Sequence, residues 1–498
     1  MSRLARNVSA NLLSNAWATA LSLILTPVYL RALGVESFGV IGFYTSMTAL
    51  MSVLDTGIST TAMREIAWLT ARPNERVKVP SLLRSLEVAY WAMLIAGGAV
   101  LLSAVLWFGA VWFRSASLPG DAIRQAMVLM VIALVAQIPS GLYSAVLIGL
   151  QRQVRCAALI TTFGTLRGIG AAGIVSYVAR DVRTFFAWQL CVSILQTCVI
   201  RHAAYQAVGS GVQPVRFSFA ALHSVKRYAG GMTVLTALSL VLTQADKIIV
   251  SRLISLESFG LYMLASTVAS GLSRVATPLM QAFGPHLTEL VSRGDDRQLA
   301  TQVRTASQLM SVLVLPPAAL LAVRPEAILF AWTGNAPVAA GAAPMLAVLA
   351  AGTAMVACSY PPLSVIYSKG RLRPVLWLNV GMVMGLIPLT VFAARTLGPM
   401  GAALCWALFG LVTYLAYLRL GLKGLPGAGV IDSLLRDFAA PAAASIVVAI
   451  IARQALQTAN SRVTIAAEVG VAVIAGWGLS LLVCRQLYSV AARQVRWS

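Results

Sequence analysis

The sequence predicts an all-α integral membrane protein with about 14 transmembrane helices, and three observations lead to this fold class. Of the 498 residues, 59% are hydrophobic and only 11% are charged, which is more apolar surface than a soluble core of this size can hide. The apolar residues occur in runs of about 20, the length that crosses a bilayer, without the alternation of barrel strands. Backbone groups at membrane depth have no water to pair with, so each run is expected to close its own hydrogen bonds as a helix.

The predicted helices follow one another with short polar or basic connections between them. They cover approximately residues 12–32, 38–60, 86–112, 122–147, 156–178, 184–204, 228–254, 259–282, 303–323, 341–367, 374–395, 399–421, 434–453 and 463–486. Pro441 and Glu468 dilute the last two runs, which are still long enough to span.

Positive charge is distributed unevenly between the predicted loops. The formal net charge of +22 would indicate nucleic-acid binding in a soluble protein. Here Lys and Arg lie mostly in alternate loops, about 25 in one set against about 10 in the other. Because positive residues are retained on the cytoplasmic side, both termini are expected to be cytoplasmic, and no nucleic-acid partner is expected.

A nine-residue segment occurs twice, each time in a short loop between two predicted spans. Arg31-Ala-Leu-Gly-Val-Glu-Ser-Phe-Gly39 follows the first span, and Arg252-Leu-Ile-Ser-Leu-Glu-Ser-Phe-Gly260 follows the seventh. Five identities in nine can arise by chance, but six spans separate the copies, so both halves would enter the membrane in the same orientation. We therefore expect two six-helix lobes, at 1–205 and 220–422, followed by two additional helices at 430–498. A central cavity between such lobes opens to alternate sides when the lobes rock.

Charged residues are rare inside the predicted spans, where each costs about 2.5 to 3.5 kcal/mol and therefore normally faces water or a partner. Those deep within a span are Asp55, Arg167, Asp246, Lys247 and Arg274. Glu87 and Glu468 also fall within apolar runs, but nearer the ends, where snorkelling or an error in the boundary accounts for them.

The deep cations are divided between the two expected lobes. Arg167 belongs to the first, whereas Lys247 and Arg274 belong to the second, so a shared cavity would be lined by positive charge from both sides. Such a lining suits an anionic substrate, because the planar guanidinium pairs with phosphate oxygens and stays charged at any relevant pH. The alternative is that Asp55 or Asp246 neutralises these cations in static ion pairs.

Four stretches of the chain resemble a known family of membrane proteins. They are Asn11-Leu-Leu-Ser-Asn-Ala-Trp17, Tyr29-Leu-Arg-Ala-Leu-Gly-Val-Glu-Ser-Phe-Gly-Val40, Leu54-Asp-Thr-Gly-Ile-Ser-Thr-Thr-Ala-Met-Arg-Glu-Ile-Ala67 and Gln244-Ala-Asp-Lys-Ile-Ile-Val-Ser-Arg-Leu253. The last is similar to an Asp-Arg/Lys-aliphatic pattern of the family, with Lys247 where Arg is common. On these segments the chain resembles the polysaccharide transporter family of lipid-linked oligosaccharide flippases, within the multidrug/oligosaccharidyl-lipid/polysaccharide exporter superfamily.

The resemblance implies a substrate, a location and partners. The substrate would be an undecaprenyl-diphosphate-linked oligosaccharide repeat unit, as in O-antigen and lipopolysaccharide assembly. It would move from the cytoplasmic to the periplasmic leaflet of the bacterial inner membrane, and a polysaccharide polymerase and assembly proteins would be partners. The family also implies a cationic lumen, formed here by Arg167, Lys247 and Arg274, with Arg64 meeting the pyrophosphate at the cytoplasmic mouth.

Coupling to an ion would require a group that binds it. Asp55 and Asp246 are the candidates for binding a proton or Na⁺. The six cysteines fall inside apolar runs and the three histidines show no ligand spacing, so no metal and no cofactor is expected.

Other functions remain open on the sequence. A flippase for the peptidoglycan precursor is poorly separated from the first interpretation, whereas a multidrug or cation antiporter of the same superfamily typically has fewer spans and an acidic cavity. A membrane-embedded polysaccharide polymerase or ligase usually needs a sizeable outer loop, and the longest one here, about 324–340, carries no paired carboxylates. The sequence has no GxxxxGK[ST] phosphate loop, and no enzymatic activity is expected.

Overall fold

The computed structural model describes residues 3–72, 75–209, 237–427, 429–455 and 461–484. Over these residues the fold is helical, and the only β pairing is an isolated bridge between Arg114 and Ser255. This confirms the predicted all-α fold class. The chain divides into two compact units, Met1–Gly260 and Leu261–Ser498.

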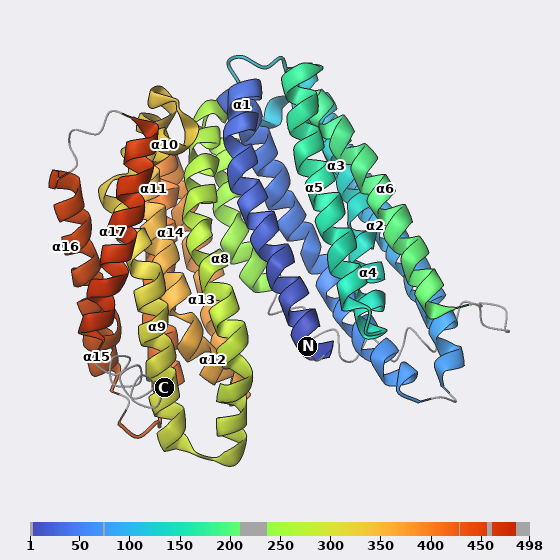
Figure 1. Cartoon of the computed structure of the whole chain (residues 1–498). Helices are drawn as coiled ribbons and strands as arrows, with labels where there is room; N and C mark the ends of the chain where they lie inside the picture. The colour runs from blue at the N-terminus through green and yellow to red at the C-terminus, as the bar shows by residue number, and fades with distance from the viewer. Residues whose placement is uncertain (1–2, 73–74, 210–236, 428, 456–460, 485–498) are drawn as a thin grey trace. The chain divides into compact units, whose positions relative to one another are not determined.

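The first unit contains α1 to α6 and the helical residues 237–253 (Figure 1). Its elements are α1 (Arg3–Thr70), η1 (Arg76–Lys78), α2 (Val79–Trp112), α3 (Gly120–Gln137), α4 (Pro139–Gly149), α5 (Gln153–Tyr177) and α6 (Val182–Val208). α1 packs against α4 and α5, and α3 packs between α2 and α6. A core of fully buried side chains joins α1, α2, α4 and α6, with Ile66, Leu83, Tyr90, Tyr143 and Ile200 among its members.

α1 consists of two helices that meet at Gly34. The φ of 80° and ψ of 173° at this residue lie outside the helical region, and glycine adopts this φ without strain because it has no Cβ. The two halves correspond to the predicted spans 12–32 and 38–60, and the second half continues to Thr70.

The fourth predicted span is divided into α3 and α4 at Pro139. Proline has no backbone N–H and cannot continue the helical hydrogen bonds. At the break, side chains of neighbouring helices contact backbone carbonyl groups. The Thr197 hydroxyl donates a hydrogen bond to the Ala136 oxygen at 2.6 Å. The Tyr90 hydroxyl lies 3.5 Å from the Ile138 oxygen. Such contacts allow a proline to break a helix at membrane depth.

The two copies of the repeated segment contact each other within the first unit. A Cβ added to Gly39 would lie 3.0 Å from the Leu256 carbonyl oxygen, and one added to Gly260 would lie 2.2 Å from the Val35 carbonyl oxygen. The backbones approach so closely that only glycine fits at these two positions.

The loop formed by residues 113–119 makes hydrogen bonds to both copies of the repeated segment. In the first copy, Glu36 accepts hydrogen bonds from the backbone N–H and hydroxyl groups of residues 115–117. In the second copy, the Leu256 N–H donates to the Arg114 oxygen at 2.8 Å. The repeat therefore marks two helix junctions, at Gly34 and at residues 254–255, which the 113–119 loop ties together.

The second unit holds most of α8 and all later helices. Its elements are α8 (Leu256–Arg293), α9 (Asp296–Val323), α10 (Pro325–Thr333), α11 (Ala336–Cys358), α12 (Tyr360–Ser368), α13 (Leu372–Leu397), α14 (Pro399–Leu422), α15 (Val430–Ser433), η2 (Leu434–Ala439), α16 (Ala440–Ala455) and α17 (Arg462–Val483). Buried residues of α8, α9, α11 and α14 form its main core, and α16 and α17 pack against α9. α10 lies in the predicted outer loop and was not expected, because nine residues are too few for a span.

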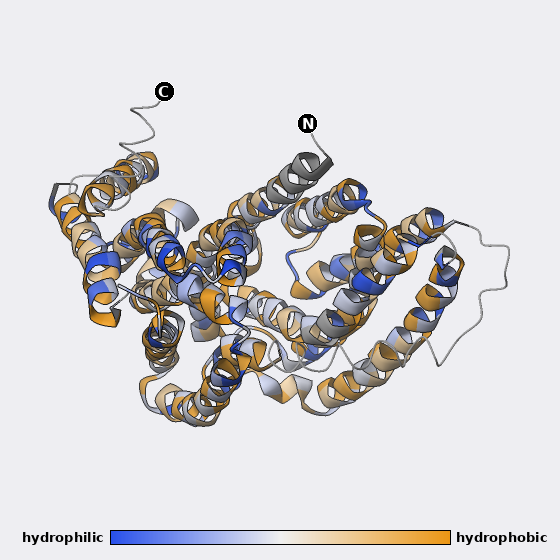
Figure 2. Ribbon diagram, turned by 90° about the horizontal axis from the view of Figure 1, so that it is seen from below, coloured by the Kyte–Doolittle hydropathy of each residue, from blue (hydrophilic) through white to orange (hydrophobic). Residues whose placement is uncertain are grey.

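Within the described part of the chain, 11 helices are long and apolar enough to cross a membrane. α1 is included once among these, although it holds two predicted spans, and the total of 14 stays a prediction. Figure 2 shows apolar residues along most helices, with hydrophilic residues in shorter stretches. The chain is therefore a multi-pass membrane protein.

Candidate functional site

Arg167, half-buried near the middle of α5, is held by neutral polar side chains. One terminal nitrogen of its guanidinium donates to Gln137 Oε1 and lies 3.5 Å from the Tyr44 hydroxyl, and the other donates to Gln196 Oε1 at 2.7 Å. These partners come from α3, α1 and α6. Tyr44 also donates to Gln137 Oε1 at 2.9 Å. Among the described residues no carboxylate pairs with Arg167, so its positive charge is not neutralised there.

Asp55, in the second half of α1, is a half-buried carboxylate. Its Oδ1 accepts hydrogen bonds from the hydroxyl groups of Ser59 and Tyr90. α4 approaches it so closely that a Cβ added to Gly141 would lie 2.3 Å from Asp55 Oδ2. Over the described ranges Asp55 forms no ion pair, and it does not neutralise Arg167.

Both networks meet the break between α3 and α4. Gln137, the last residue of α3, binds Arg167. The next carbonyl, that of Ile138, lies 3.5 Å from the Tyr90 hydroxyl, which also binds Asp55. A cation and a carboxylate, each without a charged partner in the described part of the chain, are thus connected to one proline-broken helix.

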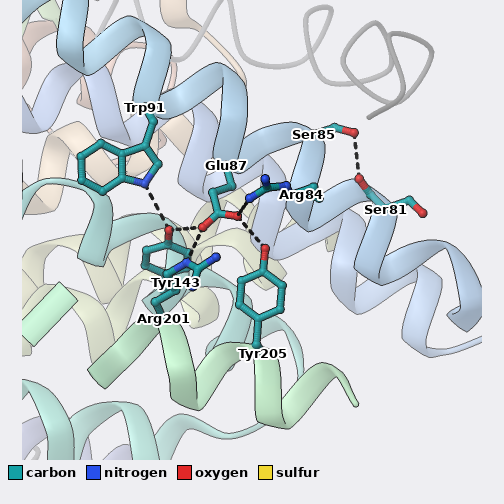
Figure 3. A network of polar contacts seen from close by, with 8 residues as sticks. All are labelled: Ser81, Arg84, Ser85, Glu87, Trp91, Tyr143, Arg201 and Tyr205. Carbon is teal, nitrogen blue, oxygen red and sulfur yellow. Dashed lines mark hydrogen bonds and ion pairs between the residues drawn. The ribbon is translucent and has the colours of Figure 1, made fainter. Parts of the chain in front are cut away.

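A third network surrounds Glu87 on α2 (Figure 3). Its carboxylate accepts hydrogen bonds of 2.6 to 2.9 Å from four side chains: Tyr143, Arg201, Tyr205 and Arg84. Trp91 in turn donates to the Tyr143 hydroxyl at 3.3 Å. The network ties α2 to α4 and α6.

The expectation that Glu87 snorkels or marks a boundary error was wrong. Its side chain is only 4% exposed, whereas Arg84 and Arg201 are 47% and 46% exposed. A buried carboxylate needs hydrogen bonds to its charged form, and four donors provide them. Arg84, three residues earlier on the same helix, is the sequence signal that could have indicated the pairing. Glu468 is also paired, with Arg324 at 3.9 Å.

Lys247 and Asp246 form an ion pair on the helical residues 237–253. The Lys247 Nζ lies 3.3 Å from Asp246 Oδ1, and both side chains are largely buried, with 12% and 8% exposed. Nζ also donates to the Thr243 oxygen at 3.0 Å. For this pair the structure has the geometry of the static alternative, so Lys247 offers less free charge than Arg167.

The two remaining predicted binding residues are exposed. Arg274 lies on α8, and no hydrogen bond or ion pair of its side chain occurs within the described residues. Arg64 lies near the end of α1. Arg274 belongs to the second unit, whereas Arg64, Arg167 and Lys247 belong to the first. The lumen formed jointly by Arg167, Lys247 and Arg274 stays a prediction.

Metal ligands do not gather in the described ranges, where no group of three or more His, Cys, Asp or Glu side chains could hold an ion. The six cysteines all lie in these ranges, and none of them forms a disulfide there. The candidate site of the first unit therefore consists of the polar networks around Arg167, Asp55 and Glu87.

Comparison with protein families identifies the chain. A family model described as polysaccharide biosynthesis protein matches residues 4–291, which is more than half of the sequence. The chain belongs to this polysaccharide biosynthesis protein family. The match confirms the resemblance expected from the sequence motifs.

A curated relative of this polysaccharide biosynthesis protein comes from Shigella flexneri and is named "Putative O-antigen transporter". The two sequences are 23% identical over 405 residues, which are 81% of this chain and 94% of the relative.

Solved structures share the fold of this family member. "Lipid II flippase MurJ, inward closed conformation" has a TM-score of 0.74 at 12% identity, with 97% of this chain and 99% of that one covered. An inward-facing multidrug resistance MATE family transporter of the MOP superfamily has a TM-score of 0.63 at 12% identity, with 82% and 93% covered. Family and fold together describe a multi-pass membrane protein of this polysaccharide biosynthesis family.

Proposed function

We propose that the protein is a flippase of the bacterial inner membrane, with both termini in the cytoplasm. Its cargo is an undecaprenyl-diphosphate-linked oligosaccharide repeat unit, which moves from the cytoplasmic to the periplasmic leaflet by alternating access. Family membership and the name of the Shigella flexneri relative support this class of cargo. The observation that carries the proposal concerns Arg167 on α5. This cation has no carboxylate partner among the residues that the structure describes.

The surroundings of Arg167 suit a phosphate better than an organic cation. Glutamine and tyrosine oxygens orient the guanidinium without neutralising it, so its charge remains available to an anion. An organic cation would be repelled at this position. Arg274, on the second unit, also has no ion pair in the described ranges and is the second proposed contact for the pyrophosphate.

The lipid carrier and its headgroup require different surroundings during transport. The polyprenyl tail stays in hydrocarbon, along a groove formed by the last two helices, while the pyrophosphate and sugars occupy a hydrated, positive cavity. This division avoids placing sugar hydroxyls in hydrocarbon, where each unpaired polar group costs several kcal/mol. The membrane potential, negative inside, favours export of an anion by about 2.3 kcal/mol per charge per 100 mV.

Asp55 is the proposed coupling group of the first unit. Its carboxylate has two hydroxyl donors and no cation within the described residues, so a proton or Na⁺ can neutralise it. Its link through Tyr90 to the α3–α4 break offers a route by which ion binding alters the Arg167 surroundings.

Deletion of the gene in its native host tests the proposed cargo. Loss of the flippase is expected to abolish a surface polysaccharide and to accumulate its undecaprenyl-diphosphate-linked repeat unit, which mass spectrometry of extracted lipids identifies. Expression of the intact chain from a plasmid should restore both. Unchanged polysaccharide and lipid profiles in the deletion strain would contradict the proposal.

A flippase for the peptidoglycan precursor is the second candidate. The fold likeness to the lipid II flippase extends over 97% of this chain, compared with 82% for the multidrug transporter. The deletion experiment separates the two candidates, because loss of a peptidoglycan precursor flippase would arrest wall synthesis and accumulate lipid II instead.

A further inference from the structure

A cavity in the second unit opens onto a buried carboxylate. It has a volume of about 400 Å³ and lies between the start of α9, the end of α14 and the connection to α15. Its lining includes Arg297, Arg304, Ser307, Leu418, Ser433 and Asp437. Such a volume is large enough, and its lining polar enough, to admit water.

Asp437 is only 2% exposed, and one of its two oxygens has no hydrogen-bond partner among the residues that the structure describes. Oδ1 accepts hydrogen bonds from Gln308 at 2.8 Å and from Arg304 at 3.2 Å. Ser433 also interacts with the carboxylate, but Oδ2 accepts no hydrogen bond within the described residues. Gln308 Oε1, on the neighbouring side chain, is a second buried oxygen without a donor. A buried acceptor left unpaired is costly, so the site favours an additional proton.

The charges around Asp437 do not balance. Arg304 is shared, because it also binds Asp432 at 2.5 Å. Asp432 has a second cation, Arg436, at 2.7 Å. Within the described part of the chain, Asp437 therefore shares a single guanidinium with Asp432, and it is the more buried of the two carboxylates. Of these two carboxylates, Asp437 is the one whose charged form is less well compensated.

The backbone at Asp437 is also irregular. The residue lies in η2, a π-helical segment in which the Ala440 N–H donates to the Leu435 oxygen. Pro441 explains the irregularity, because it lacks the N–H that would otherwise bind the Asp437 carbonyl group. π-Helical turns inside α-helices occur frequently at functional sites.

We propose that Asp437 is a proton-binding site, which receives its proton on Oδ2 through this cavity. Protonation converts the carboxylate to the neutral acid and leaves Arg304 paired with Asp432 alone. The tie between η2 and α9 then weakens. A proton fits better than Na⁺, because the guanidinium beside the carboxylate repels a metal ion and no cluster of ligands occurs in the described ranges. The site does not depend on the nature of the cargo.

The other ionisable groups near Asp437 do not compete for this proton. Three of these groups are the guanidiniums of Arg297, Arg304 and Arg436, which donate hydrogen bonds and accept none. The Tyr414 hydroxyl and the Cys484 thiol interact with the Asp437 charge and are both neutral near neutral pH. Asp432, which pairs with two cations, is the other carboxylate beside Arg304.

Infrared difference spectroscopy on the full-length protein in lipid nanodiscs tests the proposal. Spectra are compared between mildly acidic and mildly alkaline buffers, with isotope-labelled aspartate to separate Asp from Glu. Because Asp55 is itself a proposed proton or Na⁺ site, all spectra are taken in an Asp55→Asn background. In that background we expect the carbonyl stretch of a protonated aspartic acid on the acidic side. Asp437→Asn should remove it, whereas Asp432→Asn, which alters the other carboxylate on Arg304, should retain it.

A second variant keeps the test decisive if Asp437→Asn fails to fold. Gln308→Leu removes a donor that favours the charged carboxylate, so the midpoint of the band should move to higher pH. A band that persists in Asp437→Asn, or a midpoint that Gln308→Leu leaves in place, overturns the proposal. So does an aspartate signal that follows Na⁺ concentration at constant pH.

Discussion

The guanidinium of Arg167 has five N–H donors, of which three meet neutral side chains among the described residues. The others are available to a phosphate oxygen. A hydrogen bond to a charged group contributes about 1.5 to 3 kcal/mol, which corresponds to a roughly 10- to 100-fold change in rate or affinity. We expect Arg167→Ala to reduce surface polysaccharide by a factor in this range, at matched protein levels. Arg167→Lys should give a polysaccharide level between those of the wild type and Arg167→Ala, because it keeps the positive charge but loses the planar, two-pronged guanidinium.

Arg155 provides the matched control on the same helix. It is exposed and donates one hydrogen bond, to Gln206 at 2.9 Å. Arg155→Ala should therefore leave polysaccharide assembly close to the wild-type level. Equal effects of Arg155→Ala and Arg167→Ala would remove the proposed role of Arg167.

The Glu87 carboxylate predicts an effect on stability. Glu87→Gln places an amide where Arg84, Arg201 and two tyrosines all donate, so donors face donors (Figure 3). The two arginines are nearly half exposed and can rehydrate, which limits the loss to about 1 to 2 kcal/mol. Thermal unfolding of the purified protein in detergent measures it.

Glu75 is the control for Glu87. It also pairs with two cations, Arg72 and Lys78, but each at 3.6 Å and with more than half of each cation exposed. Glu75→Gln should change stability by well under about 1 kcal/mol. If both variants unfold at the same temperature, the Glu87 network does not stabilise the first unit.

At the scale of single elements, the contact between α4 and α1 predicts an effect on Asp55. Gly141→Ala would place a methyl group 2.3 Å from Asp55 Oδ2, so the carboxylate has to leave its position beside Tyr90. We expect polysaccharide assembly to fall strongly. Gly164→Ala on α5 meets nothing within 4 Å and replaces a helical glycine by a better helix former, so it should be neutral or slightly stabilising. Similar activity of the two variants would argue against a role for Asp55.

The helices themselves were predictable because their signal is local. Long apolar runs placed the spans, and all but a few of the described residues in the predicted runs are helical. The positions at which a predicted span is broken into two helices were harder to predict. Pro139 reads like any other membrane-helix proline, and its effect depends on Thr197 and Tyr90, which approach from other helices. Contacts between residues so far apart in the chain cannot be recognised from one sequence alone.

The candidate site was predictable only in part, for the same reason. A charge inside an apolar run is visible in the sequence, so Asp55 and Arg167 were found. Their partners are Gln, Ser and Tyr residues, which carry no charge and do not stand out. Glu87 was misinterpreted because its position near a span end is compatible with snorkelling, and its burial comes from α4 and α6.

At the scale of the whole molecule, the positive loops predict the topology. The loop between the predicted spans 341–367 and 374–395 contains Lys369, Arg371 and Arg373. The preceding predicted loop, 324–340, contains only Arg324 as a positive residue. The first is therefore expected in the cytoplasm and the second in the periplasm. Fusions test this, because alkaline phosphatase is active only in the periplasm and green fluorescent protein folds only in the cytoplasm. Phosphatase should be active after Gly334 and inactive after Gly370, and a full-length fusion after Ser498 should fluoresce. A full-length fusion with active phosphatase would mean that the C-terminus is periplasmic. Together with a cytoplasmic N-terminus, that result would require an odd number of spans and exclude the predicted total of 14.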